Sequence, residues 1–283
     1  MTTTVVHLGD IHFGGVADIA QVEAVEAAIG EHEPDAIVIS GDLTQRARHG
    51  ELQRGLALVR TLEDTAPVLV VPGNHDVQWW RSPFGLLGAV PRYRKWRRYF
   101  GDDLAPALEL PGLVIAGMVS AYGLSLGSVT WNQRDLTVKG HLPRTETDRV
   151  ARLFGQAPAD AVKVAVLHHN VLRGELSQRM GLAHWKDAQR RVDAIGADVV
   201  LCAHDHQEGA GDLPRGTVIS TAGTLSTRSR GGRPSAFNVV KVDGNAISIR
   251  HWRWNAAAAR HLPSDEARFA RRRAPLAAAA GGS

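Results

Sequence analysis

Acidic, amide and imidazole side chains recur at five places in the sequence, and each place directly follows a short apolar run. A short apolar run bounded by glycine or polar residues is typical of a buried strand. In an open α/β sheet, ligands bind outside the carboxyl ends of the strands, so loops in this position are expected to meet. The side chains that would meet are Asp10 and His12, then Asp42, then Asn74, His75 and Asp76, then His168 and His169, and finally His204 and His206.

These residue types together suit one kind of chemistry. A pair of divalent ions about 3.5–4 Å apart needs a bridging carboxylate and several further ligands. Aspartate, histidine and an asparagine carbonyl, without a thiolate, suit Mn²⁺, Fe or Zn²⁺ better than they suit a structural zinc site. Such ions neutralise phosphate oxygens and lower the pKa of bound water, so that hydroxide exists near neutral pH. The sequence therefore predicts two divalent metal ions (Mn, Fe or Zn) as cofactors for attack at a phosphorus centre.

The elements that would position these residues alternate between apolar strands and helices with apolar residues at helical spacing. This alternation is the parallel βαβ pattern of the α/β fold class. The expected strands are 4–8, 36–39, 68–71, 113–119, 162–167, 199–202, 216–220, 237–242 and 246–252, and the expected helices are 19–29, 52–62, 144–154 and 185–195.

Two stretches depart from this pattern. Between 77 and 101, tryptophan, proline, glycine and basic residues interrupt it, and we expect an inserted lid or side loop there. After residue 254 the sequence is rich in alanine and arginine, which predicts a tail that is partly helical or disordered. The predicted organisation is one domain over residues 1–254 followed by a C-terminal tail over 255–283.

The motifs as a set resemble those of the calcineurin-like metallophosphoesterase family. The resemblance implies a four-layer α-β-β-α sandwich, in which helices flank two mixed sheets and the metals lie at one edge. It also implies a first metal set of Asp10, His12, Asp42 and His206 and a second of Asp42, Asn74, His168 and His204, with Asp42 bridging. The motifs that carry it are Asp10-Ile11-His12, Gly41-Asp42, Gly73-Asn74-His75-Asp76, His168 and His204-Asp205-His206.

The resemblance further implies a mechanism. A hydroxide that bridges the metals would be the nucleophile, His75 would stabilise the transition state or protonate the leaving oxygen, and Asp76 would orient His75. The form Gly41-Asp42-Leu43-Thr44 is similar to the cyclic-nucleotide and glycerophosphodiester phosphodiesterase branch. We therefore predict a metal-dependent phosphoric ester hydrolase, a phosphodiesterase whose substrate is a small phosphodiester.

Two other enzymatic functions are compatible with parts of the pattern, and a non-enzymatic function is a further alternative. A DNA nuclease of the repair-exonuclease type is favoured slightly by the basic stretches, and a phosphomonoesterase would act on a small phosphorylated metabolite. A degenerate, metal-free binding module would require lost ligands, whereas every ligand type is present. Nucleic acid thus remains a possible partner, and the sequence does not determine the oligomeric state.

Four residues are predicted substrate contacts. Trp79 and Trp80 follow the metal loop that contains Asp76 and can stack on a base or form an apolar mouth. Arg94 belongs to the basic stretch 92–98, which is either a solvated helix face or a cationic rim for a phosphate-bearing substrate or single-stranded nucleic acid. His169 lies beside the expected ligand His168 and is either a substrate contact or a partner of a ligand.

Composition excludes several broad classes. With 283 residues, of which 44% are hydrophobic and 22% charged, the chain is neither disordered nor fibrous as a whole. No apolar run approaches the roughly 18 residues of a membrane span, and the N-terminus lacks the pattern of a signal peptide. The single cysteine, Cys202, has no partner for an internal disulfide, so we expect a cytoplasmic protein without a membrane partner. The net charge of +4 is compatible with an anionic substrate.

Overall fold

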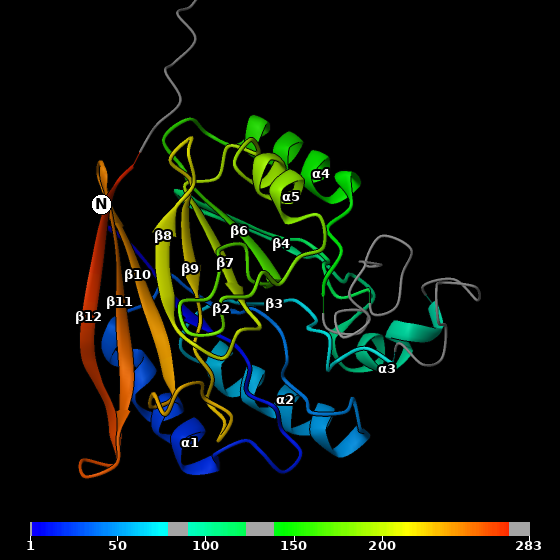
Figure 1. Ribbon diagram of the computed structural model, residues 1–283, viewed down its shortest axis with the longest axis vertical. Helices are drawn as coiled ribbons and strands as arrows, with labels where there is room; N and C mark the ends of the chain where they lie inside the picture. Colours follow the sequence, from blue (N-terminus) through cyan, green and yellow to red (C-terminus); the bar gives the residue numbers. More distant parts are fainter. Residues whose placement is uncertain (1, 79–89, 123–138, 272–283) are drawn as a thin grey trace, which may run out of the picture.

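The computed structural model describes residues 2–78, 90–122 and 139–271, which form two mixed β-sheets and the helices that cover them (Figure 1). The first sheet has the strand order β12-β11-β10-β1-β2-β3, with β1 (Thr2–Leu8), β2 (Ala36–Ile39), β3 (Val68–Val70), β10 (Ala236–Asp243), β11 (Ala246–Asn255) and β12 (Arg260–Ala270). The second has the order β4-β5-β6-β7-β9-β8, with β4 (Ala107–Leu110), β5 (Leu113–Gly117), β6 (Val162–His169), β7 (Val199–Ala203), β8 (Gly209–Asp212) and β9 (Val218–Thr221). The helices are α1 (Ile19–Ala28), the 3₁₀ helix η1 (Ile29–His32), α2 (His49–Glu63), α3 (Val90–Phe100), α4 (Arg144–Gln156) and α5 (Trp185–Val192).

Strand direction decides where the loops of the sandwich meet. In the first sheet β1, β2 and β3 are parallel, and in the second sheet β5, β6, β7 and β9 are parallel. The loops after β1 and β7 lie together, because the backbone N–H of His204 donates to the Asp10 carboxylate at 2.8 Å. The carboxyl ends of the parallel strands in both sheets therefore meet at one edge of the sandwich.

Three apolar layers hold the sandwich together, and the side chains of strand β1 contribute to two of them. Val6 and Leu8 face the apolar cluster shared with α1 and α2, whereas Val5 faces the cluster between the two sheets. A third cluster joins the second sheet to α4 and α5. Strands that are buried on both faces have continuous apolar runs, which is the pattern that the sequence has here. The predicted four-layer α-β-β-α architecture is confirmed.

The sequence predicted a C-terminal tail over residues 255–283. This prediction is wrong for residues 255–271, which are part of the folded domain. Residues 256–259 form a turn, and β12 then pairs antiparallel with β11, with Trp254 opposite His261 and Ile247 opposite Phe269. An edge strand with one exposed face needs few apolar residues, so its composition resembles that of a solvated tail. Two further strands, β4 and β8, were also not predicted from the sequence. Both are four-residue edge strands, and the sequence of β8 is Gly-Ala-Gly-Asp.

The stretch 77–101, predicted as a lid or side loop, contains helix α3. Tyr93 and Trp96 on this helix are buried, and Trp96 belongs to the apolar cluster around α2. The Tyr93 hydroxyl donates to the carbonyl of Ala121 at 2.7 Å. The described part of this stretch is thus packed against the domain, while residues 79–89 lie outside the described residues.

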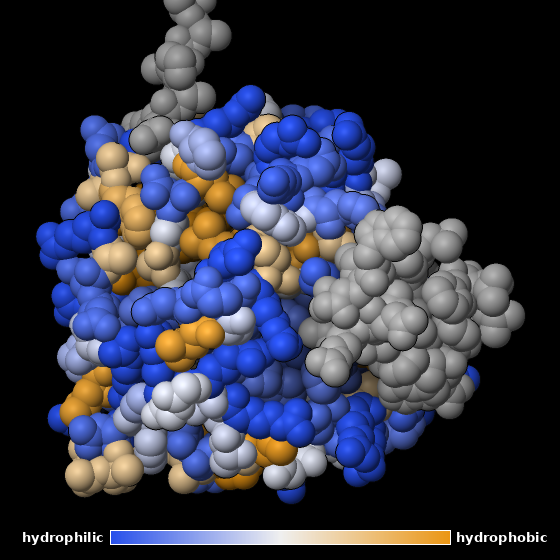
Figure 2. Space-filling view, in the orientation of Figure 1, coloured by the Kyte–Doolittle hydropathy of each residue, from blue (hydrophilic) through white to orange (hydrophobic). Residues whose placement is uncertain are grey.

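The surface in the view of Figure 2 is largely hydrophilic, and its hydrophobic area is divided into separate patches. Among residues 2–78, 90–122 and 139–271, no helix combines the length and the apolar character that crossing a membrane requires.

A buried ion pair joins the two sheets at the end opposite the loops described above. Arg271, directly after β12, donates from Nε and Nη2 to the two carboxylate oxygens of Asp198 at 2.8 and 2.9 Å, and Nη2 also donates to the carbonyl of Ala161. Asp198 precedes β7 and also accepts from the backbone N–H of Lys163. The side chains of Arg271 and Asp198 are only 4% and 9% exposed. This pair is the Arg271 clasp, and it ties the end of the last strand to the second sheet.

We expect Arg271→Ala to lower the free energy of unfolding by about 3 kcal/mol, because it leaves the Asp198 carboxylate buried without its partner. Arg268→Ala is the matched control. The Arg268 side chain is 78% exposed and pairs with Glu266, so its loss should change stability by less than about 0.5 kcal/mol. Urea unfolding measures the free energy of unfolding of both variants. Equal losses of stability in the two variants would contradict a stabilising role of the clasp.

Candidate metal centre

The side chains predicted as metal ligands converge where the carboxyl ends of the strands meet. Both sheets contribute, so the cluster exists only because the sheets pack against each other. Asp10 and His12 follow β1, Asp42 follows β2, Asn74 follows β3, His168 lies in β6, and His204 and His206 follow β7. The structure therefore brings all seven predicted ligand side chains together.

The backbone at this cluster is strained. Of the ten described non-glycine residues with positive φ, five are predicted ligands, with φ between 51° and 74°. A side chain with a Cβ rarely adopts this left-handed conformation, and such residues concentrate at functional sites. The strain turns the side chains out of the strand ends toward a common point. The five are Asp10, His12, Asp42, His204 and His206.

Two glycines of the motifs allow the loops to approach. A Cβ on Gly73 would lie 2.1 Å from Oδ1 of Asp42, and a Cβ on Gly41 would lie 2.8 Å from Nδ1 of His168. Gly41 also has a φ of +90°. Any side chain at these positions would push Asp42 or His168 out of the cluster, which explains why glycine precedes Asp42 and Asn74.

One group of ligand atoms lies around His168. Its Nε2 is 3.0 Å from Oδ1 of Asn74, 3.2 Å from Nδ1 of His204 and 3.3 Å from Oδ2 of Asp42. Asn74 Oδ1 is also 3.0 Å from His204 Nδ1. Ligand atoms about 2.1 Å from one ion are separated by about 3 Å, so these four atoms have the spacing of a shared coordination shell.

A second group lies around His12. Its Nε2 is 3.0 Å from Nε2 of His206, 3.9 Å from Oδ1 of Asp10 and 3.7 Å from Oδ2 of Asp42. Asp42 Oδ2 is the same oxygen that lies 3.3 Å from His168. A single carboxylate oxygen thus faces both groups, as a bridging ligand between two ions would.

The free polar atoms of the cluster fit a pair of cations. Oδ1 of Asp10 is buried and has no hydrogen-bond partner within the described structure, although it faces His12 and His206. Nδ1 of His168 lies 2.9 Å from the carbonyl of Ser40, and a carbonyl can only accept. Nδ1 therefore carries the proton and Nε2 is left to face the cluster. Imidazoles that bind metals are fixed in this way by the nitrogen that does not bind.

The pKa values of the proposed ligands in the protein without ions also bear on cation binding. Burial alone would raise the pKa of Asp42, but His168, His75 and His12 together hold it well below its usual value. Burial alone would lower the pKa of His168, but Asp42 raises it to about 9, so without ions Nε2 holds a proton that a bound metal ion would displace. Burial lowers the pKa of His12 to about 3 and that of His206 to about 4. Those two rings are therefore neutral near pH 7, with a lone pair available to a metal.

His75 is oriented by Gln45 and not, as the sequence suggested, by Asp76. Nδ1 of His75 lies 2.8 Å from the carbonyl oxygen of Gln45, so Nδ1 carries the proton and Nε2 is left for a reacting group. The ring of His75 lies edge-on to that of His12, with 4.9 Å between the ring centroids. The partner of His75 is a main-chain carbonyl, so no residue type in the sequence could have indicated it.

Asp76 instead fastens two loops to each other. Its Oδ1 accepts from the backbone N–H and the hydroxyl of Thr44, both at 2.8 Å, and its Oδ2 accepts from the N–H groups of Gly73 and Leu43. Burial and the neighbouring Asp42 raise the pKa of Asp76 to about 6. The carboxylate holds the loop after β2 against the loop after β3, which keeps Asp42 beside Asn74.

The predicted substrate contacts have mixed outcomes. His169 is buried, and its Nδ1 lies 2.9 Å from the hydroxyl of Ser120. His168, His169 and His204 each offer a ring nitrogen within 4.8 Å of the others, so His169 borders the same cluster. Arg94 is exposed on α3. Trp79 and Trp80 lie outside the described residues. A role of these side chains in substrate binding stays a prediction.

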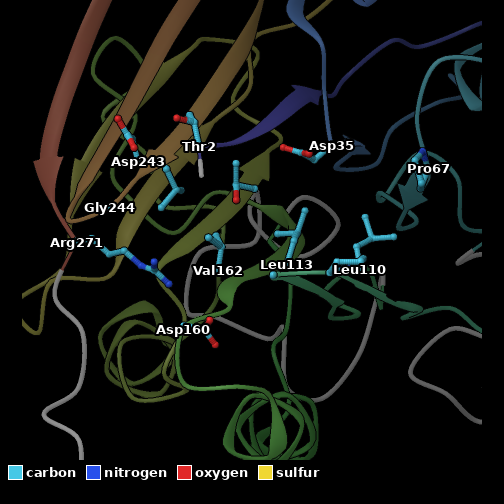
Figure 3. Close-up of a pocket in the computed structure, with 14 residues that line it drawn as sticks. Thr2, Asp35, Pro67, Leu110, Leu113, Asp160, Val162, Asp243, Gly244 and Arg271 are labelled. Carbon is cyan, nitrogen blue, oxygen red and sulfur yellow. The ribbon is translucent and has the colours of Figure 1, made fainter.

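A large cavity lies elsewhere in the molecule. It has a volume of about 830 Å³ and opens between the two sheets at their other end, where Thr2, Asp35 and Val162 begin or precede strands (Figure 3). Arg271 of the clasp also lines it. None of the predicted ligands does, so the candidate site rests on the metal-like cluster and not on the volume of a cavity.

Comparison with known proteins identifies the group to which the sequence is similar. The sequence model of the family described as calcineurin-like phosphoesterase matches residues 3–208, a range that contains every predicted ligand. A curated relative, the glycerophosphodiester phosphodiesterase GpdQ of Enterobacter lignolyticus (strain SCF1), is 30% identical over 152 residues, which cover 48% of this chain and 52% of the relative. The chain thus spans about half the length of the curated relative that it matches.

Solved structures show the same fold at low sequence identity. A dimetal phosphatase from Danio rerio superposes with a TM-score of 0.63 at 12% identity, over 95% of this chain and 99% of that one. GAP50, described as the anchor in the inner membrane complex of Plasmodium, has a TM-score of 0.58 at 12% identity, over 89% and 84% of the two chains. At such identities the likeness concerns the fold alone.

We expect Asp76→Asn to destabilise the protein even without metal, by about 2 kcal/mol, because the new amide group would face N–H donors that need an acceptor. Urea unfolding of the metal-stripped protein is the measurement. Asp102→Asn, on an exposed loop, is the control and should be neutral. If Asp76→Asn lowered activity but left the stability of the stripped protein unchanged, the fastening role would be refuted.

Proposed function

The chain belongs to the calcineurin-like phosphoesterase family, whose members act on phosphate esters, and from this premise we propose that it is a two-metal phosphodiesterase. The observation that carries the proposal is the position of Asp42. Its Oδ2 lies 3.3 Å from Nε2 of His168 and 3.7 Å from Nε2 of His12, so one carboxylate oxygen can serve two ions.

The proposed ligands divide into two sets that share Asp42. Asp10, His12, Asp42 and His206 would hold the first ion, and Asp42, Asn74, His168 and His204 the second. When bound, Mn, Fe or Zn ions in these places would lower the pKa of water and neutralise the charge on the phosphate oxygens. The donor set of carboxylate, amide oxygen and imidazole, and the orphaned Oδ1 of Asp10, support this assignment.

His75 is the proposed proton donor to the leaving oxygen. The carbonyl of Gln45 holds the proton on Nδ1 and fixes the plane of the ring. A proton carried on Nε2 would therefore be on the ring nitrogen that does not face Gln45, in a ring that packs edge-on against His12. A histidine held in one orientation can deliver this proton without first reorganising, which is the source of general-acid catalysis.

A diester substrate is favoured by two observations. The curated relative is a glycerophosphodiester phosphodiesterase, and the Gly-Asp-Leu-Thr motif has the form of the same branch. Thr44 of this motif bonds both to Asp76 and to the carbonyl of His75, so the motif helps to build the site. A DNA nuclease and a phosphomonoesterase are the alternatives. Relative rates on glycerophosphodiesters, cyclic nucleotides, aryl mono- and diesters and single-stranded DNA separate them, and a higher rate on monoesters than on diesters would contradict the proposal.

The shared role of Asp42 predicts a pattern of metal loss. Asp42→Ala should lose both ions, whereas Asn74→Ala should lose only the ion near His168. Both should reduce hydrolysis of bis(p-nitrophenyl) phosphate at least about a hundredfold, since the charge of the transition state is no longer compensated. Metal analysis of the reconstituted proteins measures the stoichiometry. Turnover like that of the wild type in Asp42→Ala would refute the site.

His75→Ala should leave the metal content unchanged and lower kcat between about a hundredfold and ten-thousandfold for an alkyl diester. The loss should be smaller for a p-nitrophenyl ester, because p-nitrophenolate leaves without a proton. His49→Ala, at an exposed histidine on α2, is the control. An equal loss for both leaving groups would show that His75 is not the general acid.

A further inference from the structure

The loop between β9 and β10 is fastened to the first proposed metal set. Nδ1 of His206 donates to the carbonyl of Arg228 at 3.1 Å, and the N–H of Arg230 donates to the carbonyl of His206 at 3.4 Å. The hydroxyl of Thr224 donates to the carbonyl of Asp10. The loop thus touches two of the four proposed ligands, and residues 228–230 lie directly beside the ligand His206.

The turn within this loop is also fixed internally. The N–H of Arg228 donates to the hydroxyl of Ser226 at 3.2 Å, and Ser226 is 2.8 Å from the hydroxyl of Thr224. The backbone that bears Arg228 is therefore held at both its N–H and its carbonyl. Side chains on a fixed backbone lose less freedom when they bind a ligand than side chains on a free loop.

The three arginines of the loop differ in how their charge is compensated. Arg233 pairs with Glu175 at 2.8 Å and with Glu208 at 3.7 Å. Arg230 uses only Nε, which bonds to the carbonyl of Asp205 and lies 3.3 Å from its carboxylate. The two terminal nitrogens of Arg230 make no hydrogen bond or ion pair within the described structure. The guanidinium of exposed Arg228 makes none there either.

Two guanidinium groups with free terminal nitrogens at this place need an explanation, although Nε of Arg230 pairs with the Asp205 carboxylate. Arg230 lies beside the first set, because its main-chain N–H donates to the carbonyl of His206 at 3.4 Å. Ions bound to the first set would repel both arginines, unless an anion lies between them. The ions already neutralise the phosphate that reacts, so the arginines are suited to a further anionic group on the same substrate.

We propose that Arg228 and Arg230 form an anion subsite beside the first metal set, which selects phosphate esters that carry a second phosphate a few bonds from the phosphorus that reacts. This proposal rests on the proposed function, since it names the substrate class of that site. Guanidinium groups bind phosphate through paired, charge-assisted hydrogen bonds, and the free ends of both side chains offer such donors.

Two substrates that differ by one phosphate test the subsite. They are p-nitrophenyl thymidine 5′-phosphate and the same ester with a 3′-phosphate. In the wild type, kcat/KM should be about tenfold higher for the 3′-phosphorylated ester, the gain expected from one charge-assisted contact. Arg228→Gln and Arg230→Gln should each remove most of this preference, mainly through a higher KM. Arg228→Lys should keep part of it, because the charge remains while the paired hydrogen bonds of the guanidinium are lost.

Two controls separate the subsite from general damage. Arg215→Gln removes an exposed arginine from the turn between β8 and β9, at the other end of the sandwich, and should keep the full preference. Metal content should be unchanged in every variant, which shows that His206 is still in place. An unchanged preference in both Arg228→Gln and Arg230→Gln would overturn the subsite, and so would a wild type without any preference.

A binding measurement distinguishes failure of the subsite from failure of the proposed function. Calorimetric titration should show that thymidine 3′,5′-bisphosphate binds the metal-loaded wild type about tenfold more tightly than thymidine 5′-phosphate. The difference should disappear in the two glutamine variants. If this difference is present while no ester is hydrolysed, the proposed function fails and the subsite stands. If esters are hydrolysed and the difference is absent, the subsite fails alone.

Discussion

The site depends on one constraint: a single oxygen of Asp42 must face histidines that come from different sheets. His12 follows β1 in the first sheet and His168 lies in β6 of the second, and both reach Oδ2 of Asp42 within 3.7 Å. This is possible only with a left-handed backbone at Asp42 and with Gly73 close against its carboxylate. The left-handed conformation of Asp42 and the glycine at position 73 both serve this one requirement.

The strain at this edge is tolerated because the rest of the sandwich is rigid. Five left-handed ligand residues would each relax in a free loop, at a gain on the order of 1 kcal/mol or more apiece. Here they extend from strands whose apolar residues are buried on both faces, so the loops cannot relax without disturbing the core. Asp76 adds three hydrogen bonds between two of these loops and a fourth within its own loop. The polar edge and the apolar core are thus parts of one structure.

Much of the fold and of the candidate site could be predicted from the sequence, and each wrong prediction has a physical cause. The strand at 36–39 was placed at its observed bounds, because a strand buried on both faces is a continuous apolar run. The family was also identified correctly from its motifs. Strand β12 was missed because its stability comes from pairing with β11, which composition does not reveal. The role assigned to Asp76 was wrong because the partner of His75 is the carbonyl of Gln45, and main-chain atoms leave no signal in residue types.

Because each proposed metal set takes ligands from both sheets, metal binding and packing of the sheets must be linked. The first set combines Asp10 and His12 with His206, and the set around His168 includes Asn74 of the loop after β3. An ion that binds only the packed arrangement stabilises it by mass action. At the far end the Arg271 clasp joins the same two sheets with protein groups alone. The sandwich is therefore fastened at one end by a permanent ion pair and, in the proposed holoenzyme, at the other by its cofactors. The end that reacts would be the one whose stability depends on metal supply.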